Sequence, residues 1–321
     1  MSTILLASDG SVRSLRVLPH ALRLAQWTDA TLISARFAFG TQEAPTEAQA
    51  TARSLEAAAE QDGARLIVES RVVYPRRGES MAARILRFAR AKGAELIALD
   101  ASGEDAIQRS AALKLLWEML VGGDRPILIT GANARPPDSS TCPRLAVATD
   151  LSAASLAMMP LLANWRPTMW SDVTLLTVCG MQSGRPCPEA EIASARRRLN
   201  DAARALPAAA PLTLRAEPIR AAEPVEDAIL RSVAEAGADF LMVGSSGAAG
   251  ASGIGRTALR LMDRASLPLI IAPPGHATTE GASSVGGGSF SSCRSETQHR
   301  DPGSTVPPIR RIRGSRDERR H

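Results

Sequence analysis

The sequence predicts an α/β protein built from two tandem doubly wound domains, each with a five-stranded parallel sheet and about four helices. Three observations lead to this fold class. Short apolar runs alternate with longer stretches in which apolar residues recur about every 3.6 positions. The short runs are apolar throughout, which is typical of strands that a parallel sheet buries on both faces. The whole pattern occurs twice within 321 residues, a length that suits two domains.

The two halves repeat the same motifs in the same order. An apolar run ends at Asp9 and again at Asp150, an offset of 141 residues, and a serine follows two positions later in both halves. The last apolar run of each half begins at a proline, Pro126 or Pro268, an offset of 142 residues. Proline is tolerated at the start of a strand. Repetition in order and at nearly one offset indicates a duplicated domain.

The elements of each half follow from this periodicity. In the first half, strands are predicted near 3–8, 31–36, 65–73, 94–99 and 126–130. Helices are predicted near 12–26, 43–62, 79–92 and 106–121. In the second half, strands are predicted near 144–149, 172–178, 212–219, 239–243 and 268–272, with helices between them.

Composition shifts along the chain predict the domain boundaries. The expected segments are a first domain at 1–131, a linker at 132–143, a second domain at 144–274 and a tail at 275–321. The stretch from Gly131 to Pro143 contains glycine, asparagine and three prolines, which is typical of a linker. The tail is rich in Gly, Ser, Thr, Pro and Arg and has almost no apolar spacing. We expect it to be disordered, because it cannot bury enough surface to offset its chain entropy.

Charge and apolar content exclude several classes of protein. The net charge is +5, but the tail after Pro274 carries eight arginines against five acidic residues, so most of the excess lies outside the predicted domains. A solvated tail is therefore preferred over nucleic-acid binding, and nonspecific phosphate binding through the tail arginines stays an alternative: Arg310, Arg311, Arg313, Arg316, Arg319 and Arg320. No run of about 18 apolar residues predicts a membrane span. The N-terminus lacks the basic and long apolar regions of a signal peptide, which favours a cytoplasmic protein.

Cysteine and histidine content predicts no metal site. The four cysteines are unpaired in the sequence and form no CxxC motif. They are expected to act as small buried side chains in a reducing compartment. The one histidine well inside a folded segment, His20, falls in the middle of a predicted helix and is expected to be a packing residue.

The loops that follow the fourth strand differ sharply between the halves. In the second half, residues 244–257 contain five glycines and no large side chain before Ile254. Small residues let backbone amides approach an anion, and a helix beginning near Gly255 would direct its positive end there. The first-half counterpart, residues 100–106, has one glycine and three carboxylates. Its negative charge would repel phosphate, so a nucleotide is expected only in the second half.

These motifs resemble the universal stress protein family over residues 1 to about 274. Asp9-Gly10-Ser11 and Asp150-Leu151-Ser152 are similar to its first motif, and Gly244-Ser245-Ser246-Gly247 is similar to the start of its glycine loop. The resemblance implies an adenine nucleotide alpha hydrolase-like fold. It also implies that the aspartate contacts adenine and that the glycine loop holds ribose and phosphates.

The resemblance predicts an ATP or related adenine-nucleotide site in the second half. The residues expected there are Asp150, Ser152, Val178, Val243, Gly244, Gly247, Gly255, Arg256 and Thr257. No ligand for Mg²⁺ is assigned.

Two departures from the family pattern fall at the phosphate end of this site. Seven residues, where the family has nine, separate Gly247 from Gly255, and Arg256 replaces the family's serine. In the first half Leu113 stands where the third glycine would be. Binding of a different adenine nucleotide therefore stays open.

Two functions follow from the sequence. The first is a stress-response or regulatory protein that binds an adenine nucleotide. The alternative is a scaffold without ligand, in which the final strands, near 127–129 and 269–271, pair the two halves and cover their apolar edges. A homodimer is also compatible with this pairing.

Catalysis is not predicted, because no nucleophile motif or pair of acids is found. Slow ATP hydrolysis is not excluded by the sequence. Glu79 and Glu223 are expected to be first-turn acids of helices.

Overall fold

The computed structural model describes the chain in segments that cover most of both halves. They are residues 2–9, 11, 13–37, 57, 65–68, 72–74, 76–101, 106–131, 133–135, 142–165, 170–180, 187–204, 206, 212–218, 223–246 and 254–274. The chain separates into one unit at Met1–Thr278 and another at Thr279–His321. The predicted tail and nearly all of the predicted helix at 43–62 lie outside the described residues.

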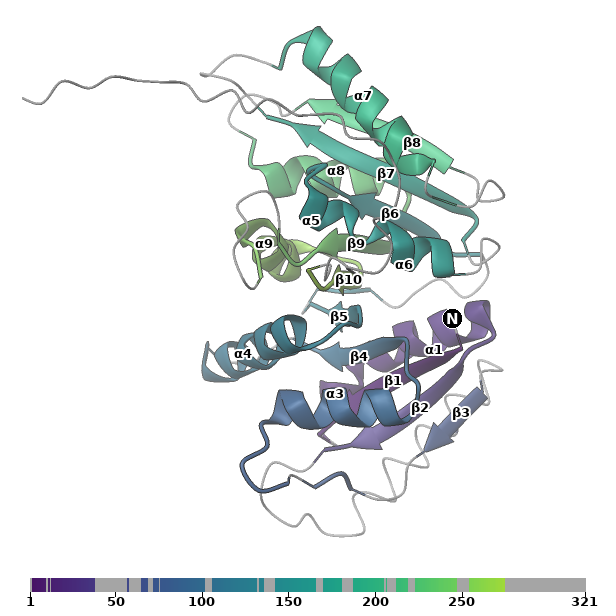
Figure 1. Cartoon of the computed structure of the whole chain (residues 1–321), viewed down its shortest axis with the longest axis vertical. Coiled ribbons are helices and arrows are strands. Elements are labelled where there is room, and N and C mark those ends of the chain that lie inside the picture. Colours follow the sequence, from purple (N-terminus) through teal and green to yellow (C-terminus); the bar gives the residue numbers. More distant parts are fainter. Residues whose placement is uncertain are drawn as a thin grey trace, which may run out of the picture. The chain divides into compact units, whose positions relative to one another are not determined.

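The first half alternates strands and helices as predicted (Figure 1). Its strands are β1 (Thr3–Ser8), β2 (Thr31–Arg36), β3 (Arg65–Val68), β4 (Leu96–Asp100) and β5 (Ile127–Thr130). Its helices are the 3-10 helix η1 (Arg13–Val17) followed by α1 (Leu18–Thr28), α3 (Met81–Ala91) and α4 (Ala106–Gly122). Of the predicted strand at 65–73, β3 covers Arg65–Val68 and Val73 forms an isolated bridge with Phe37, whereas residues 69–71 lie outside the described residues.

The second half repeats this order. Its strands are β6 (Arg144–Ala148), β7 (Asp172–Cys179), β8 (Leu212–Pro218), β9 (Phe240–Gly244) and β10 (Leu269–Ala272). Its helices are α5 (Ala153–Leu156), α6 (Met159–Asn164), α7 (Glu189–Ala203), α8 (Val225–Ala236) and α9 (Arg256–Arg264). The first helical region is divided in two, and Pro160 occupies the first turn of α6, a position that proline favours.

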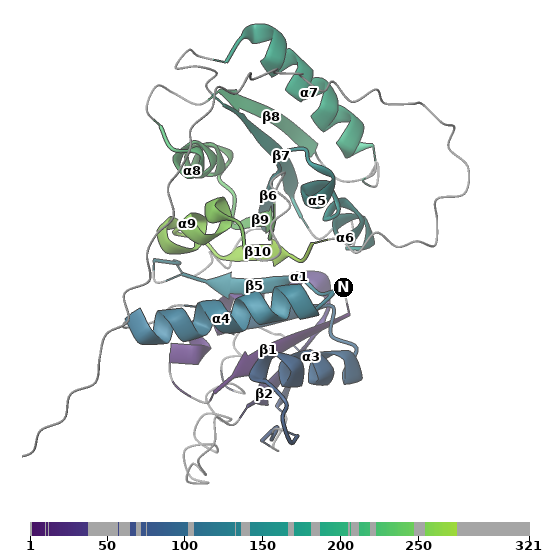
Figure 2. The ribbon, with the colours of Figure 1, turned by 60° about the vertical axis from the view of Figure 1, so that its left-hand side comes forward.

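The ten strands form one continuous sheet in the order β3-β2-β1-β4-β5-β10-β9-β6-β7-β8. Strands within each half are parallel. The two halves join through β5 and β10, which are antiparallel with Leu128 opposite Ile270 (Figure 2). The predicted pairing of the final strands is therefore present, and these two apolar strands cover each other's edges.

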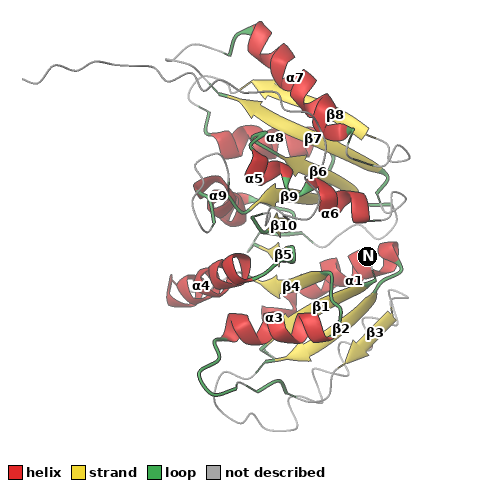
Figure 3. Ribbon diagram, viewed as in Figure 1, coloured by secondary structure: helices red, strands yellow, loops and turns green. Residues whose placement is uncertain are grey.

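Helices pack on both faces of the sheet, which defines the doubly wound architecture (Figure 3). Alternate residues of each strand enter separate cores, because successive side chains of a strand point to opposite faces. In β1, Leu6 joins the core that includes α1, α6 and α7. Leu5 joins the core that includes α3, α4, α8 and α9. Each core runs through both halves, so the duplicated domains share their apolar interior.

Candidate functional site

A cavity of about 640 Å³ lies at the carboxyl ends of β6, β7 and β9 in the second half. β6 lies between β7 and β9, and the chain runs outward from β6 to β7 before it returns to β9. This reversal is the topological switch point at which ligands bind in open α/β sheets. Val178 and Val243 contribute apolar lining, and Asp150 and Arg256 are the charged groups among the described lining residues.

The structure brings most of the predicted site residues to this cavity. Ser152 is not among the residues that line it, and Gly247 lies outside the described residues. The others line the cavity together: Asp150, Val178, Val243, Gly244, Gly255, Arg256 and Thr257.

The first turn of α9 opens into the cavity. Gly255 is the N-cap in an extended conformation and supplies no side-chain cap. The amides of a first helical turn have no acceptor within the helix, and Arg256, Thr257 and Ala258 of this turn line the cavity. The amide of Gly255 itself donates to the carbonyl of Ser245 at 2.6 Å. Binding of an anion therefore depends on the first-turn amides and on Arg256.

Ser245 supplies a buried hydroxyl that the sequence analysis did not select. Ser245 is among the lining residues of the cavity and is only 1% exposed, and its Oγ has no hydrogen-bond partner within the described part of the chain. Its amide donates to the carbonyl of Ala272 at 2.8 Å, which fixes the backbone. A buried polar group without a partner costs about 1–3 kcal/mol, so a polar ligand group beside Ser245 would recover free energy.

A serine network orients the Asp150 carboxylate. Oδ1 of Asp150 accepts hydrogen bonds from the Ser152 amide at 2.9 Å and from the Ser155 hydroxyl at 2.6 Å. Ser152 also caps α5 by accepting from the Ser155 amide at 3.2 Å. Ser152 therefore acts on the cavity through Asp150 and through the start of α5.

Leu151 holds an unfavourable backbone conformation between these two residues. Its φ is 59°, in the left-handed region that costs free energy for a residue with a Cβ. Its amide donates to Oγ1 of Thr149 at 3.0 Å and its carbonyl accepts from Arg198 at 2.8 Å. Its side chain is buried. These contacts stabilise the turn that presents Asp150.

The first half carries the same network. The Ser11 amide donates to Oδ1 of Asp9 at 2.9 Å, and the Ser14 amide donates to Oγ of Ser11 at 3.1 Å. The hydroxyl of Ser14 lies 2.7 Å from that of Ser8, just as those of Ser155 and Thr149 lie 2.8 Å apart. Ser14 and Ser155 are not among the residues predicted from the sequence, although their separation of 141 residues equals that of the two aspartates.

The two halves differ where a phosphate would bind. α9 begins twelve residues after β9 ends, whereas α4 begins six residues after β4 ends. At the offset of the two prolines, Leu113 within α4 corresponds to Gly255 before α9. The first half therefore presents the side of a helix where the second half presents a helix N-terminus. Leu113, which stands where the third glycine would be, therefore lies inside a helix, whereas Gly255 lies immediately before one.

An ion pair is also duplicated, and it corrects the expected role of Glu79 and Glu223. Neither glutamate lies in a first turn, because α3 and α8 begin two residues after them. The Glu79 carboxylate accepts from Arg87 at 2.7 and 3.1 Å, and this hydrogen bond lowers the pKa of Glu79 to about 2. Glu223 accepts from Arg231 at 3.1 and 3.3 Å. Each pair joins the start of a helix to its middle.

A third glutamate fixes α9 against α8. Glu226 is buried and accepts a hydrogen bond of 2.7 Å from Arg260. Burial alone would raise the pKa of Glu226, but hydrogen bonds from its own amide and from Arg260 outweigh burial and lower it. This contact helps to place the first turn of α9 beside the cavity.

His20 is a packing residue at the junction of the halves. It is 3% exposed, and its ring meets that of Phe240 edge-on at 6.5 Å. Burial lowers the pKa of His20 to about 4, so the side chain is neutral near pH 7. It is not among the residues that line the second-half cavity.

Other kinds of site find no support in the described residues. No group of three or more His, Cys, Asp or Glu residues is arranged to hold a metal ion there. Cys142, Cys179 and Cys187 are not joined in disulfides, and burial raises the pKa of Cys187 to about 11. A search of the described helices found none with the length and apolar character of a membrane span.

Comparison with known proteins gives a family match for part of the chain and structural neighbours for most of it. Residues 1–117 match the model of the Universal stress protein family. The crystal structure of a universal stress protein from Archaeoglobus fulgidus has a TM-score of 0.54 and 15% identity, covering 84% of this chain and 97% of that chain. A Pseudomonas aeruginosa structure described as a universal stress protein also has a TM-score of 0.54 and 15% identity, with coverage of 86% and 94%.

A further solved structure is a universal stress protein in complex with cAMP. It has 22% identity and a TM-score of 0.32, and covers 40% of this chain and 95% of that chain. No match was found among curated proteins. Residues 1–117 therefore belong to the universal stress protein family, and the likeness to the two longer structures extends the family's fold to the second half.

Proposed function

We propose that this universal stress protein is a stress-response or regulatory protein that binds ATP or a related adenine nucleotide in the second-half cavity. The observation that carries the proposal is the position of Ser245. Ser245 is a lining residue of the cavity into which the first turn of α9 opens, and its buried hydroxyl lacks a partner within the described residues. A polar, anionic ligand could hydrogen-bond to the Ser245 hydroxyl and to the first-turn amides of α9.

The lining divides into regions that suit the parts of a nucleotide. Val178 and Val243 offer apolar surface for the base, and the oriented Asp150 carboxylate can accept a hydrogen bond from the adenine amino group. Arg256 and the amides of the first turn of α9 would hold phosphate. The volume of about 640 Å³ lies within the range of small-molecule sites.

Gly244 allows this part of the backbone to pack closely. A Cβ at Gly244 would lie 3.3 Å from the Ser246 carbonyl oxygen and 3.4 Å from Cα of Ser155. Any larger residue would therefore press on the helix that orients Asp150. The glycine supports the shape of the cavity in addition to any contact it makes with a ligand.

The chemistry of the lining favours binding over catalysis. Among its described residues, the charged groups are Asp150 and Arg256, and Asp150 is fixed by hydrogen bonds to two serines. The replacement of the family's serine by Arg256 adds positive charge at the phosphate end. The unsatisfied hydroxyl of Ser245 favours this function over a scaffold that binds no ligand. Without a ligand, the free-energy cost of burying this hydroxyl without a hydrogen-bond partner would not be offset.

Calorimetric titration of the full chain with ATP, ADP, cAMP and adenosine tests the proposal. We expect saturable binding of at least one phosphorylated ligand. Arg256→Ala should weaken ATP binding about tenfold, since it removes a charge-assisted contact, and should leave adenosine binding nearly unchanged. Lys114→Ala, at the corresponding position of the first half, is the matched control and should have no effect. Absence of saturable binding by the wild type would refute the proposal, as would equal losses in the two variants.

A further inference from the structure

Two cysteines of the second half lie where one strand ends and the next helix begins. Cys179 is the last residue of β7, and Cys187 stands two residues before α7. β7 and β8 are parallel, so α7, which packs on both strands (Figure 2), must begin at the edge of the sheet where β7 ends. The topology therefore brings the two cysteines to the same edge, although residues 180–186 separate them in the sequence.

The side chains of the two cysteines meet in one core. Cys187 is buried in the core that includes α1, α6 and α7, and Cys179 packs against the same core. Cys179 is also a side-chain hydrogen-bond partner of Cys187. Two thiols in direct contact need only small side-chain rotations to reach the separation of a disulfide.

The surroundings give the two thiols different access to an oxidant. Cys187 is only 8% exposed, and its thiol donates to Oε2 of Glu191 at 3.5 Å. Burial and this hydrogen bond raise the pKa of Cys187 to about 11, so it stays protonated near pH 7 and reacts slowly with dissolved oxidants. Cys179 is half-buried. A dissolved oxidant therefore reaches Cys179 first, and Cys187 lies beside it as the second thiol.

The cysteine pair belongs to the second half alone. The sequence places its four cysteines at positions 142, 179, 187 and 293, so residues 1–131 contain none. The pair is thus not a part of the framework that the two halves share. Cys179, Cys187 and Glu191 are not arranged to hold a metal ion, because the described residues contain no such group of three or more. Oxidation to a disulfide is the chemistry that two adjacent thiols support.

We propose that Cys179 and Cys187 are a redox site, which a hydroperoxide converts into a disulfide and a dithiol returns to two thiols. This inference does not depend on the proposed nucleotide site. It agrees with reduced cysteines under resting conditions, because the disulfide forms only when an oxidant is present.

The reaction with hydrogen peroxide has two steps. The thiolate of Cys179 attacks one peroxide oxygen and the O–O bond breaks. The sulfur becomes a sulfenic acid, and the departing hydroxide takes up the proton of the thiol and leaves as water. The sulfur of Cys187 then attacks the sulfenic sulfur and the S–O bond breaks. The proton of Cys187 passes to this second hydroxide, so two thiols and one peroxide give one disulfide and two waters.

Counting of thiols on the full chain tests the proposal. The protein is treated with hydrogen peroxide, the excess is removed with catalase, and the chain is unfolded with N-ethylmaleimide and weighed by mass spectrometry. The chain has four cysteines, so we expect four labels before oxidation, two after it, and four again when dithiothreitol precedes the labelling. Peptide mapping should place the disulfide between Cys179 and Cys187. Oxidation should also raise the Tm by about 5 °C, because the disulfide restricts the unfolded chain.

Variants then separate the roles of the two thiols. Cys187→Ser should leave a sulfenic acid on Cys179 that dimedone traps, because the second thiol is missing. Cys179→Ser should give neither a disulfide nor a dimedone adduct at Cys187. Cys142→Ser is the matched control, since Cys142 is also half-buried, and it should form the disulfide at the wild-type rate. Thermal melting verifies that each variant is folded, and Cys187→Ala replaces Cys187→Ser if the buried hydroxyl prevents folding.

Three results would overturn the proposal. They are four labels on the wild type after oxidation, a disulfide that joins other cysteines or two chains, and the same loss of labels in Cys179→Ser as in the wild type. Titration with ATP is a separate measurement on the reduced protein, so failure of either proposal can be recognised on its own.

Discussion

Ser155 donates a hydrogen bond of 2.6 Å from its hydroxyl to Oδ1 of Asp150. A buried side chain of α5 therefore orients the carboxylate that lines the second-half cavity. The corresponding serine of the first half, Ser14, bonds to Ser8 and to the carbonyl of Ser11. The duplicated network thus offers matched positions at which stability and ligand binding can be separated.

Ser155→Ala is expected to reduce both stability and nucleotide affinity. It removes one buried hydroxyl and should lower the free energy of unfolding by about 1–2 kcal/mol. ATP affinity should fall several-fold, because Asp150 loses the contact that orients it. Ser14→Ala should cost similar stability without any change in ATP affinity. Denaturant unfolding and calorimetry measure the two effects, and equal loss of ATP affinity in both variants would contradict the assignment.

Leu151 allows a direct test of backbone strain. Leu151→Ala and Leu151→Gly both remove the buried side chain, but only glycine adopts a φ of 59° without strain. We expect the glycine variant to be more stable than the alanine variant by about 1 kcal/mol. At most positions the glycine variant is the less stable of the two, because glycine loses more conformational freedom on folding. Chemical unfolding curves of the two variants measure the difference, and a more stable alanine variant would show that the turn is unstrained.

His20 should make the protein less stable in acid. The histidine of the unfolded chain takes up a proton below its ordinary pKa of 6.5, whereas the folded protein keeps His20 neutral down to about pH 4. The unfolded state therefore binds more protons between these values, and stability falls as the pH falls from 6.5 to 4. The full effect is on the order of 3 kcal/mol.

His20→Leu should flatten the dependence of unfolding free energy on pH in this window. Glu79→Gln is the control, because the pKa of Glu79 is lowered to about 2 by Arg87. The stability from that ion pair is present above the ordinary pKa of 4.5 and is lost as the pH falls toward 2. Glu79→Gln should therefore change the free energy of unfolding mainly below the pH range of 6.5 to 4 in which His20 acts. An unchanged slope between pH 6.5 and 4 in His20→Leu would contradict this account.

The pairing of β5 with β10 should make the two halves unfold together. Ile270 is fully buried and lies opposite Leu128 in the other half. Ile270→Ala should lower the free energy of unfolding by about 2–5 kcal/mol, and hydrogen exchange should accelerate in β5 as well as in β10. Val121→Ala, at an exposed position of α4, should change stability by less than about 0.5 kcal/mol. Faster exchange confined to β10 would show that the halves are independent.

The sequence predicts the elements of this fold well because their signals are local. Apolar runs such as Leu96 to Leu99 mark the strands, and prolines mark the start of the final strand in each half. The start of α9 after Gly255 and that of α4 at Ala106 agree with the sequence prediction. The duplicated motifs also placed Asp150, Gly244 and Arg256 at one edge of the sheet.

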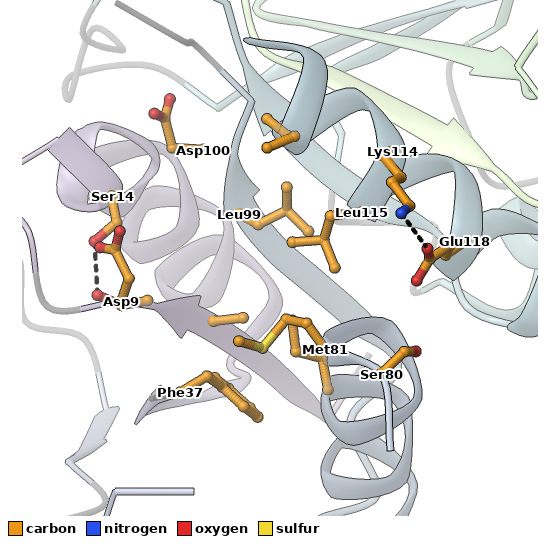
Figure 4. A pocket seen from close by; sticks show the side chains of 15 residues that line it. Asp9, Ser14, Phe37, Ser80, Met81, Leu99, Asp100, Lys114, Leu115 and Glu118 are labelled. Atoms are coloured by element: carbon orange, nitrogen blue, oxygen red, sulfur yellow. Dashed lines mark hydrogen bonds and ion pairs between the residues drawn. The ribbon is translucent and has the colours of Figure 1, made fainter. Parts of the chain in front are cut away.

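The parts that escaped prediction depend on contacts between distant residues. The buried hydroxyl of Ser245 is without a partner only because its surroundings are folded. The amide of Gly255 turns to the Ser245 carbonyl, which no spacing rule reveals. A cavity in the first half is lined by Leu115, Phe37 and Met81, which come together from separate elements of the fold (Figure 4). Ser14 and Ser155 could have been found, since the repeat offset aligns them.

The nucleotide is expected to bind in the second half and not in the first. Photocrosslinking of the full chain with 8-azido-ATP, followed by peptide mapping, distinguishes the two halves. We expect saturable labelling of peptides from the second-half cavity, around 148–155, 176–178 or 243–258, and suppression of labelling by unlabelled ATP. Labelling of first-half peptides around 7–14 or 111–118, or labelling that excess ATP does not suppress, would contradict it.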